Sequence, residues 1–205
     1  MRSLLWLLVA AGLGVGQDED EKKKKPAGAS SPASNERFAS ACLKAIAAAQ
    51  ADFRANDRDG NRVNDFWVAD IGGLYRVEAG VSIKLIEMNM AKADAKPCVA
   101  TDKAGALPDG TKLTALGPPA PISGYWFVAV EKAVDEKGVA VRYDAGQGRA
   151  SSSFGVCAYP AEYGKGGRRT FILNEANVVW AKDLAGKAVD VFPLNPASEG
   201  WKKLD

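Results

Sequence analysis

The chain contains no histidine, and this absence narrows the chemistry that it can perform. Catalytic Ser-His-Asp and Cys-His groups, zinc sites of the metalloprotease type and a histidine general base all need an imidazole ring. An enzyme of this composition would have to use carboxylates, Lys or Tyr, and no spacing of the acids marks a pair as acid and base. We therefore expect no enzyme, and we assign no catalytic, cofactor-binding or metal-ligating residue and no cofactor.

Cysteine is scarce as well, with three residues at Cys42, Cys98 and Cys157. In an oxidising compartment three thiols form at most one disulfide and leave one thiol over. Cys42 lies on the apolar side of a predicted helix, so we expect a buried free thiol there. Cys98 and Cys157 are the favoured pair, although the sequence alone leaves the connectivity open.

A hydrophobic run long enough to cross a membrane is also missing. The apolar run from Leu4 to Val15 is far shorter than the roughly 20 residues that a spanning helix needs. Arg2 precedes this run, and Gly14 and Gly16 stand just before Gln17, which is the layout of a cleavable secretory signal. We predict that residues 1–16 are a signal peptide, that the protein is exported to the periplasm or the extracellular space, and that no membrane span remains after cleavage.

Charge of one sign is not in excess. The chain has 27 Lys and Arg residues against 25 Asp and Glu residues, and the Lys22 to Lys25 run is neutralised by the acids at positions 18 to 21. This balance does not indicate a nucleic acid or an acidic membrane as partner. Residues 17–33 are rich in charge, Ala, Ser and Pro, so they are predicted to be a disordered linker. The partner stays unknown, with an envelope or extracellular protein or polymer as the candidates.

Residues 34–205 are enough for one domain with a substantial core. Ser34 is predicted to cap a first helix, because an apolar stripe follows it. The stripe has five residues at helical spacing, namely Phe38, Cys42, Ile46, Ala49 and Phe53. A second helical pattern covers Val81 to Ala93 and ends before Pro97.

The rest of the domain supplies strands. Ile122 to Val130 is an apolar strand, and Val139 to Tyr143 is predicted to pair with it across a turn at residues 135–138. Phe154 to Tyr159 leads through a Gly-rich corner into a hairpin formed by residues 169–174 and 177–183. About five strands result, so the predicted class is α+β with the helices on one face of an antiparallel β-meander.

The segment from Phe154 to Leu184 resembles the C-terminal signature of an exported bacterial family known as domain of unknown function 2950. In that family a strand that ends in A-Y-P-A-x-Y-G is followed by a T-F-x-V-N hairpin and a K-D-L ending; here residues 158–164 read AYPAEYG, 170–174 read TFILN and 182–184 read KDL. The hairpin turn of the family usually has Gly where this chain has Asn177, and Asn is the next-best residue at positive φ. The resemblance implies an exported protein and names no activity.

The helix sequence ACLKAIAAAQADFR, residues 41–54, resembles the A-x-x-x-AQ-x-x-Y/F helix of the same family. It is also similar, more loosely, to the long helix of type IV pilin-like proteins. The resemblance implies a pilin-like fold, in which one long N-terminal helix packs on an antiparallel meander of about five strands.

The segment Asp57 to Asp65 has oxygen side chains in alternation at Asp57, Asp59 and Asn61, as a calcium loop does. An EF-hand loop needs Gly at its sixth position and a bidentate acid at its twelfth, and no register of this segment supplies both. We interpret the segment as the end of a helix followed by a polar turn with Gly60 at positive φ. Whether the loop binds an ion is left open.

The Gly-rich corner offers a candidate interaction surface. Its backbone N–H groups and two guanidinium groups could hold an anion, but it lacks the G-x-x-x-x-G-K-[ST] motif of a phosphate loop. Packing of the aromatic residues at the corner is the alternative. The residues of this surface are Tyr159, Tyr163, Lys165, Arg168 and Arg169.

Three classes of function follow. The first is an exported, non-catalytic structural or interaction module of the bacterial envelope or extracellular space. The second is a protein that binds a small ligand, an anion or a metal ion, and the third is an enzyme that works without histidine.

Overall fold

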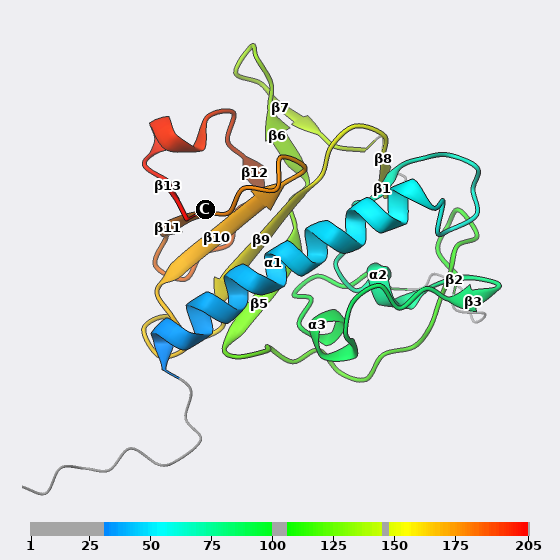
Figure 1. Ribbon diagram of the computed structural model, residues 1–205, viewed down its shortest axis with the longest axis horizontal. Coiled ribbons are helices and arrows are strands. Elements are labelled where there is room, and N and C mark those ends of the chain that lie inside the picture. The colour runs from blue at the N-terminus through cyan, green and yellow to red at the C-terminus, as the bar shows by residue number, and fades with distance from the viewer. Residues whose placement is uncertain (1–30, 100–105, 145–147, 205) are drawn as a thin grey trace, which may run out of the picture.

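A computed structural model describes residues 31–99, 106–144 and 148–204 (Figure 1). The predicted signal peptide and residues 17–30 of the predicted linker lie outside the described residues. Within the described ranges, no helix combines the length and the apolar character needed to cross a membrane.

The helices are α1 (Pro32–Ala55), α2 (Gly73–Arg76), α3 (Met88–Lys92) and the 3₁₀ helix η1 (Pro196–Glu199). The strands of the first half are β1 (Phe66–Trp67), β2 (Val77–Ala79), β3 (Val81–Ser82), β4 (Lys112–Leu113) and β5 (Tyr125–Ala129). Those of the second half are β6 (Lys132–Val134), β7 (Ala140–Arg142), β8 (Arg149–Ala150), β9 (Gly155–Pro160), β10 (Arg169–Asn174), β11 (Trp180–Asp183), β12 (Val191–Phe192) and β13 (Lys202–Lys203).

The helix α1 begins earlier than the sequence predicted. Ser31 is the N-cap, and its side chain accepts a hydrogen bond from the backbone N–H of Ser34 at 3.1 Å. Pro32 follows at the first helical position, where its fixed φ and missing N–H do no harm. The prediction of Ser34 as the cap is therefore wrong, because Pro32 already starts the helix.

The buried side of α1 also differs from the predicted stripe at one end. Cys42, Ile46, Ala49 and Phe53 are buried as expected, but Phe38 is 41% exposed. The buried face continues through other residues of the same side, namely Ala39, Leu43 and Gln50. In the N-terminal part of the helix the fully buried residue is thus Ala39, and its neighbour Phe38 is not.

The main sheet has five strands in the order β13-β11-β10-β9-β5, and every neighbouring pair is antiparallel. The predicted α+β class with an antiparallel sheet is therefore confirmed. The hairpin of β10 and β11 is present, and Asn177 in its turn has φ of 56°, as the departure from Gly required. The three other sheets are small, with two or three strands each.

One strand pairing was predicted wrongly. The strand β7 pairs with β6 rather than with β5, across the expected turn at residues 135–138. The predicted long strand at residues 122–130 ends at Ala129, and β6 then starts a separate sheet with β7 and β12. The neighbour of β5 in the main sheet is instead β9.

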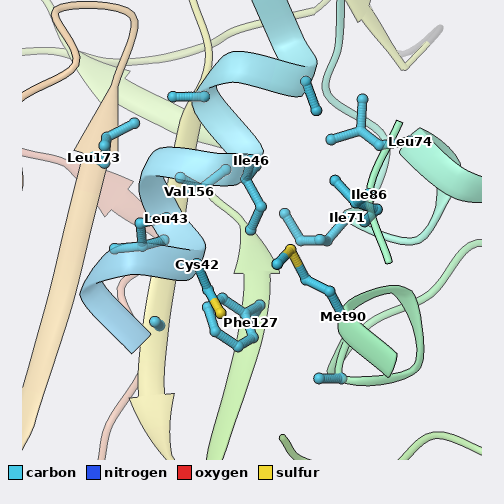
Figure 2. Packing of buried hydrophobic residues seen from close by; sticks show 14 of the residues in the cluster. Cys42, Leu43, Ile46, Ile71, Leu74, Ile86, Met90, Phe127, Val156 and Leu173 are labelled. Atoms are coloured by element: carbon cyan, nitrogen blue, oxygen red, sulfur yellow. The ribbon is translucent and has the colours of Figure 1, made fainter. Parts of the chain in front are cut away.

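The main sheet is buried on both faces. The helix α1 lies across one face, over β9 and β10 (Figure 1). Figure 2 shows Leu43 and Ile46 of α1 among Val156, Leu173 and other residues of this core, which the α2–α3 region completes. On the opposite face a second cluster contains Cys157 and Ile172 with residues of the C-terminal segments. This double burial explains why β9 and β10 are apolar almost throughout.

The predicted second helix is largely wrong. Only Met88 to Lys92 is helical, while Val81 and Ser82 form β3. The backbone N–H of Ile83 bonds to Val77 and that of Leu85 bonds to Leu74, so these groups serve contacts with α2 and β2 instead of a helix. The apolar residues do recur at helical spacing, but hydrogen bonds to other elements determine the backbone conformation here.

All three cysteines are free thiols, so the favoured pairing of Cys98 with Cys157 is wrong. Cys157 belongs to the cluster on one face of the main sheet, whereas Cys98 packs against the core on the other face. Cys42 is buried, as expected, and burial raises the pKa of its thiol to about 11.

Candidate functional site

The structure contains an open groove of about 900 Å³. Its walls come from the loop between α1 and β1, from β2 and β4, from β8, and from Tyr143 and Asp144 after β7. The α1–β1 loop, β2 and β3 lie together at the right of Figure 1. Five acids and two cations line this groove, which we call the acidic groove: Asp59, Asp65, Glu78, Asp109, Asp144, Lys112 and Arg149.

Arg149 is the anchored cation of the acidic groove. Its side chain is 10% exposed, and its guanidinium carbon lies 3.9 Å from the centre of the Trp67 ring system. Its Nε atom donates to Asp59 Oδ2 at 2.6 Å, and its Nη2 atom donates to the Thr111 hydroxyl at 3.2 Å. Stacking and ion pairing therefore hold this guanidinium against the floor of the groove.

Trp67 is held in place by contacts with α1, with α2 and with Asp70 in the loop between β1 and α2. The Gln50 side chain of α1 exchanges two hydrogen bonds with the Trp67 backbone, and the indole N–H donates to Asp70 Oδ1 at 2.8 Å. A Cβ atom at Gly73 would overlap the indole, so the close packing of α2 on this ring requires glycine. Because β1 pairs Trp67 with Arg149 of β8, the rigid indole also fixes the position of the guanidinium.

The loop at residues 57–65, which we call the Asp57 loop, forms the wall nearest to Arg149. Asp57 Oδ2 accepts a hydrogen bond from the backbone N–H of Arg62 at 3.0 Å. The side-chain amide of Asn61 donates to Asp59 at 3.1 Å and to Asp65 at 3.2 Å. Gly60 has φ of 70°, as predicted, and Arg62 also takes a left-handed conformation, with φ of 67°.

Three carboxylate oxygens of the Asp57 loop are left without partners. The Oδ1 atoms of Asp57, Asp59 and Asp65 are buried and accept no hydrogen bond within the described part of the chain. Burial, together with the nearby carboxylates of Asp59 and Asp57, raises the pKa of the Asp65 carboxyl above its ordinary value. The loop therefore gathers negative charge in a place that is partly shielded from water.

The Gly-rich corner does hold an anion, and the anion belongs to the chain itself. The backbone N–H groups of Arg168 and Arg169 donate to Glu36 Oε1 at 2.9 and 3.2 Å. The Arg169 guanidinium adds an Nε contact and an Nη2 contact to Glu36 Oε2, both at 2.8 Å. This cradle ties the N-terminal part of α1 to the start of β10. Lys165 lies apart from it and pairs with Glu162 at 2.7 Å.

The two tyrosines of the predicted interaction surface lie in different surroundings. Tyr159 is partly buried and packs against the cluster on the face of the sheet opposite α1. Tyr163 is 42% exposed; its hydroxyl donates to Asp183 at 3.0 Å, and the Arg168 guanidinium lies over its ring. Of the five predicted residues, Tyr159 and Arg169 thus also make contacts within the fold, and the interaction surface stays a prediction.

Two further carboxylates, Asp70 and Asp94, are buried beneath the α2–α3 region. Asp94 accepts the backbone N–H groups of Ile71, Gly72 and Lys96. Asp70 accepts the Trp67 indole N–H and two backbone N–H groups, and Arg76 lies 3.7 Å from it. Every one of these four oxygens is occupied by the fold, so the pair organises loops and offers no free base.

Sequence reasoning found the Asp57 loop but missed the rest of the acidic groove. Arg149, Glu78 and Asp109 come from three separate segments and carry no spacing signal of their own. Of the groove, the pattern Asp57, Asp59 and Asn61 was the part that a local motif could reveal. Trp67 was missed as well, because a buried aromatic in a short strand usually indicates core packing.

Comparisons with known proteins agree with the family resemblance. Neither a curated protein nor a solved structure matches the chain. The family model described as "Protein of unknown function (DUF2950)" matches residues 32–204, which include both the acidic groove and the Gly-rich corner. The chain therefore belongs to the DUF2950 family of proteins of unknown function.

Proposed function

We propose that the protein is an exported, non-catalytic interaction module of the bacterial envelope or extracellular space, and that the acidic groove is its binding face. Export rests on the signal layout of residues 1–16, and a pilin-like head is supported by α1 lying across an antiparallel sheet. The single observation that carries the binding face is a concave surface of about 900 Å³ with an excess of carboxylates. Ligand sites have volumes of roughly 300 to 1,000 Å³.

The charge of the groove selects its partner. Five acids stand against two cations, and one of these cations, Arg149, is held by Asp59 and Trp67. Glu78 and Asp109 are exposed at the rim, where they meet solvent and an approaching molecule. Surfaces of opposite charge attract one another, so the groove favours a lysine- or arginine-rich segment of an envelope or extracellular protein.

The binding face is tested with two short fluorescent peptides of equal length, one rich in lysine and the other rich in glutamate. Fluorescence anisotropy should show that the purified protein binds the lysine-rich peptide at low salt and that affinity falls as salt rises. The double variant Glu78→Gln, Asp109→Asn should weaken binding at least about threefold, because it removes two rim charges. Glu199→Gln in η1, at the far side of the molecule in Figure 1, is the matched control.

Equal binding of the two peptides would contradict the proposal that the acidic groove is the binding face. A double variant that binds the lysine-rich peptide like the wild type would contradict it as well. Export is tested separately by the intact mass of the protein recovered outside the cytoplasm. A mass that lacks residues 1–16 supports the signal, and a mass that retains them contradicts it.

A further inference from the structure

We propose that the Asp57 loop is a calcium-binding site, whose ligands are the side chains of Asp57, Asp59, Asn61 and Asp65 and the backbone carbonyl of Val63. The inference goes beyond the binding of a basic partner and does not depend on it. It rests on the three buried carboxylate oxygens without hydrogen-bond partners in the described structure.

Buried oxygens of this kind are normally satisfied by a hydrogen-bond donor or by a cation. An unpaired polar atom away from water costs free energy, and buried charges are normally paired or coordinate a metal. The Asp59 side chain is only 4% exposed, and Asp65 is 6% exposed, yet each keeps one oxygen unused. These oxygens are therefore available as ligands for a cation.

The protein's own cations do not neutralise the loop. Arg149 contacts Asp59 through Oδ2 and leaves Oδ1 unused. Arg58 is turned to Asp52, with two contacts at 2.5 and 3.1 Å. Three loop carboxylates thus stand against two guanidinium groups, those of Arg149 and Arg62, and an excess of one negative charge remains.

The spacing and the backbone agree with an EF-hand register that begins at Asp57. Ligands in that register occupy positions one, three, five, seven (through the backbone carbonyl) and nine, which here are residues 57, 59, 61, 63 and 65. The sixth position requires a left-handed backbone, for which glycine is the usual residue. Arg62 adopts that conformation, with φ of 67°, and its N–H bonds to Asp57 Oδ2. The lack of Gly at position six is therefore no obstacle.

The twelfth position is Val68, so the loop lacks the bidentate acid of an EF-hand. Among the described residues no three His, Cys, Asp or Glu side chains already converge as a metal-binding group. The Asn61 amide nitrogen instead bridges Asp59 and Asp65, while its oxygen accepts the Val63 N–H at 2.6 Å; a rotation that turns the oxygen inward would exchange these bonds for a ligand. Because the loop borders the open groove, water can supply the remaining ligands. Five oxygen ligands without the bidentate acid predict weak binding, in the range of about 10⁻⁴ to 10⁻³ M known for extracellular modules.

Calcium fits these ligands better than other ions. All five ligands are oxygens, whereas zinc prefers nitrogen and sulfur ligands, so the site does not favour zinc. Magnesium demands a near-ideal octahedron and gives up water reluctantly, whereas calcium accepts irregular geometry and six to eight ligands.

Isothermal titration calorimetry of the purified, EDTA-treated full chain with CaCl₂ tests the site. We expect one Ca²⁺ per chain, and binding of Mg²⁺ at least about tenfold weaker. Asp59→Asn and Asp65→Asn should each weaken Ca²⁺ binding at least about tenfold, because each removes a negative ligand. Arg62→Gly should bind Ca²⁺ at least as tightly as the wild type. Glycine suits the left-handed position, and the change removes a positive charge that repels Ca²⁺.

Asp135→Asn is the matched control, because Asp135 also caps a polar turn, in the β6–β7 hairpin, and should not affect Ca²⁺. If Asp59→Asn or Asp65→Asn fails to fold by circular dichroism, Asn61→Ala decides the case, since Asn61 is exposed and its loss should still weaken Ca²⁺ binding. The proposal is overturned if the wild type shows no heat of binding with CaCl₂ up to about 10 mM. That concentration is about tenfold above the weakest expected dissociation constant. Loop variants that bind like the wild type overturn it as well.

The calcium and peptide experiments can fail independently. Peptide binding is measured with changes at Glu78 and Asp109, outside the Asp57 loop, and calcium binding is measured with changes inside it. A chain that binds Ca²⁺ but not the basic peptide keeps the calcium site and loses the proposed binding face.

Discussion

Replacing Asp94 with asparagine should change how the stability of the protein depends on pH. Asp94 is 1% exposed, and its two oxygens accept three backbone N–H groups at 2.7 to 2.9 Å. Burial, together with the nearby Asp70 carboxylate, raises the pKa of Asp94 from its ordinary value of 3.8 to about 6. Arg76 lies 3.7 Å from Asp70, where it partly compensates that charge.

The sign of the effect follows from the raised pKa. The folded protein binds this proton more tightly than the unfolded chain, so the contribution is fully present below about pH 4 and is lost as pH rises through about 6. A shift from 3.8 to about 6, at roughly 1.4 kcal/mol per pH unit, corresponds to about 3 kcal/mol. Asparagine cannot titrate. The free energy of unfolding of the wild type, minus that of the variant, should therefore fall by about 3 kcal/mol between about pH 3 and pH 7.

A second effect of Asp94→Asn does not depend on pH. The amide nitrogen of asparagine cannot accept a hydrogen bond, so at least one of the three backbone N–H groups loses its partner, at a cost of about 1 to 3 kcal/mol. Urea denaturation of both proteins at several pH values separates the two effects, because the first changes the slope of the difference against pH and the second changes its offset. Glu199→Gln, at an exposed acid, serves as the control. A difference that stays constant with pH, or that grows as pH rises, would refute the reasoning.

Two further predictions concern the Gly-rich corner. Tyr159→Ala should cost about 2 to 3 kcal/mol of unfolding free energy because Tyr159 packs against an apolar cluster, whereas the half-exposed Tyr163→Ala should cost less than about 1 kcal/mol; equal costs in urea denaturation would contradict this difference. Glu36→Gln should cost about 1 to 2 kcal/mol at pH 7, because it weakens charge-assisted bonds from Arg168 and Arg169. Burial opposes the shift, but those bonds lower the pKa of Glu36. The stability that Glu36 contributes is therefore lost as the pH falls through its pKa in the folded protein. A loss of unfolding free energy in Glu36→Gln that grows towards acid pH would contradict this reasoning.

Local backbone chemistry made part of the fold predictable from the sequence. The β10–β11 hairpin was recognised from two runs of strand-forming residues around a turn, and Asn177 takes the positive φ that its place in the turn required. The positive φ of Gly60 was predicted for the same kind of reason. Such features depend on a few neighbouring residues, and the sequence displays those neighbours directly.

Long-range contacts overrode local signals elsewhere. Helical spacing at residues 81–93 was real, but the N–H groups of Ile83 and Leu85 bond to other elements, and the predicted helix is reduced to five residues. Phe38 lies on the predicted stripe, yet its side chain is 41% exposed. Propensity and spacing act over one or two turns, whereas burial is decided by whichever segment packs alongside.

The sequence by itself determined that histidine chemistry is excluded, that the class is α+β, and that oxygen side chains alternate in the Asp57 loop. Only the tertiary structure decided what surrounds those oxygens. It brought Arg149 and Trp67 to the loop, left three carboxylate oxygens buried without partners, and gave the anion cradle at Arg168 and Arg169 to Glu36. The physical reason is that the energy of a charge depends on its distance from water and from other charges, and chain folding alone sets those distances.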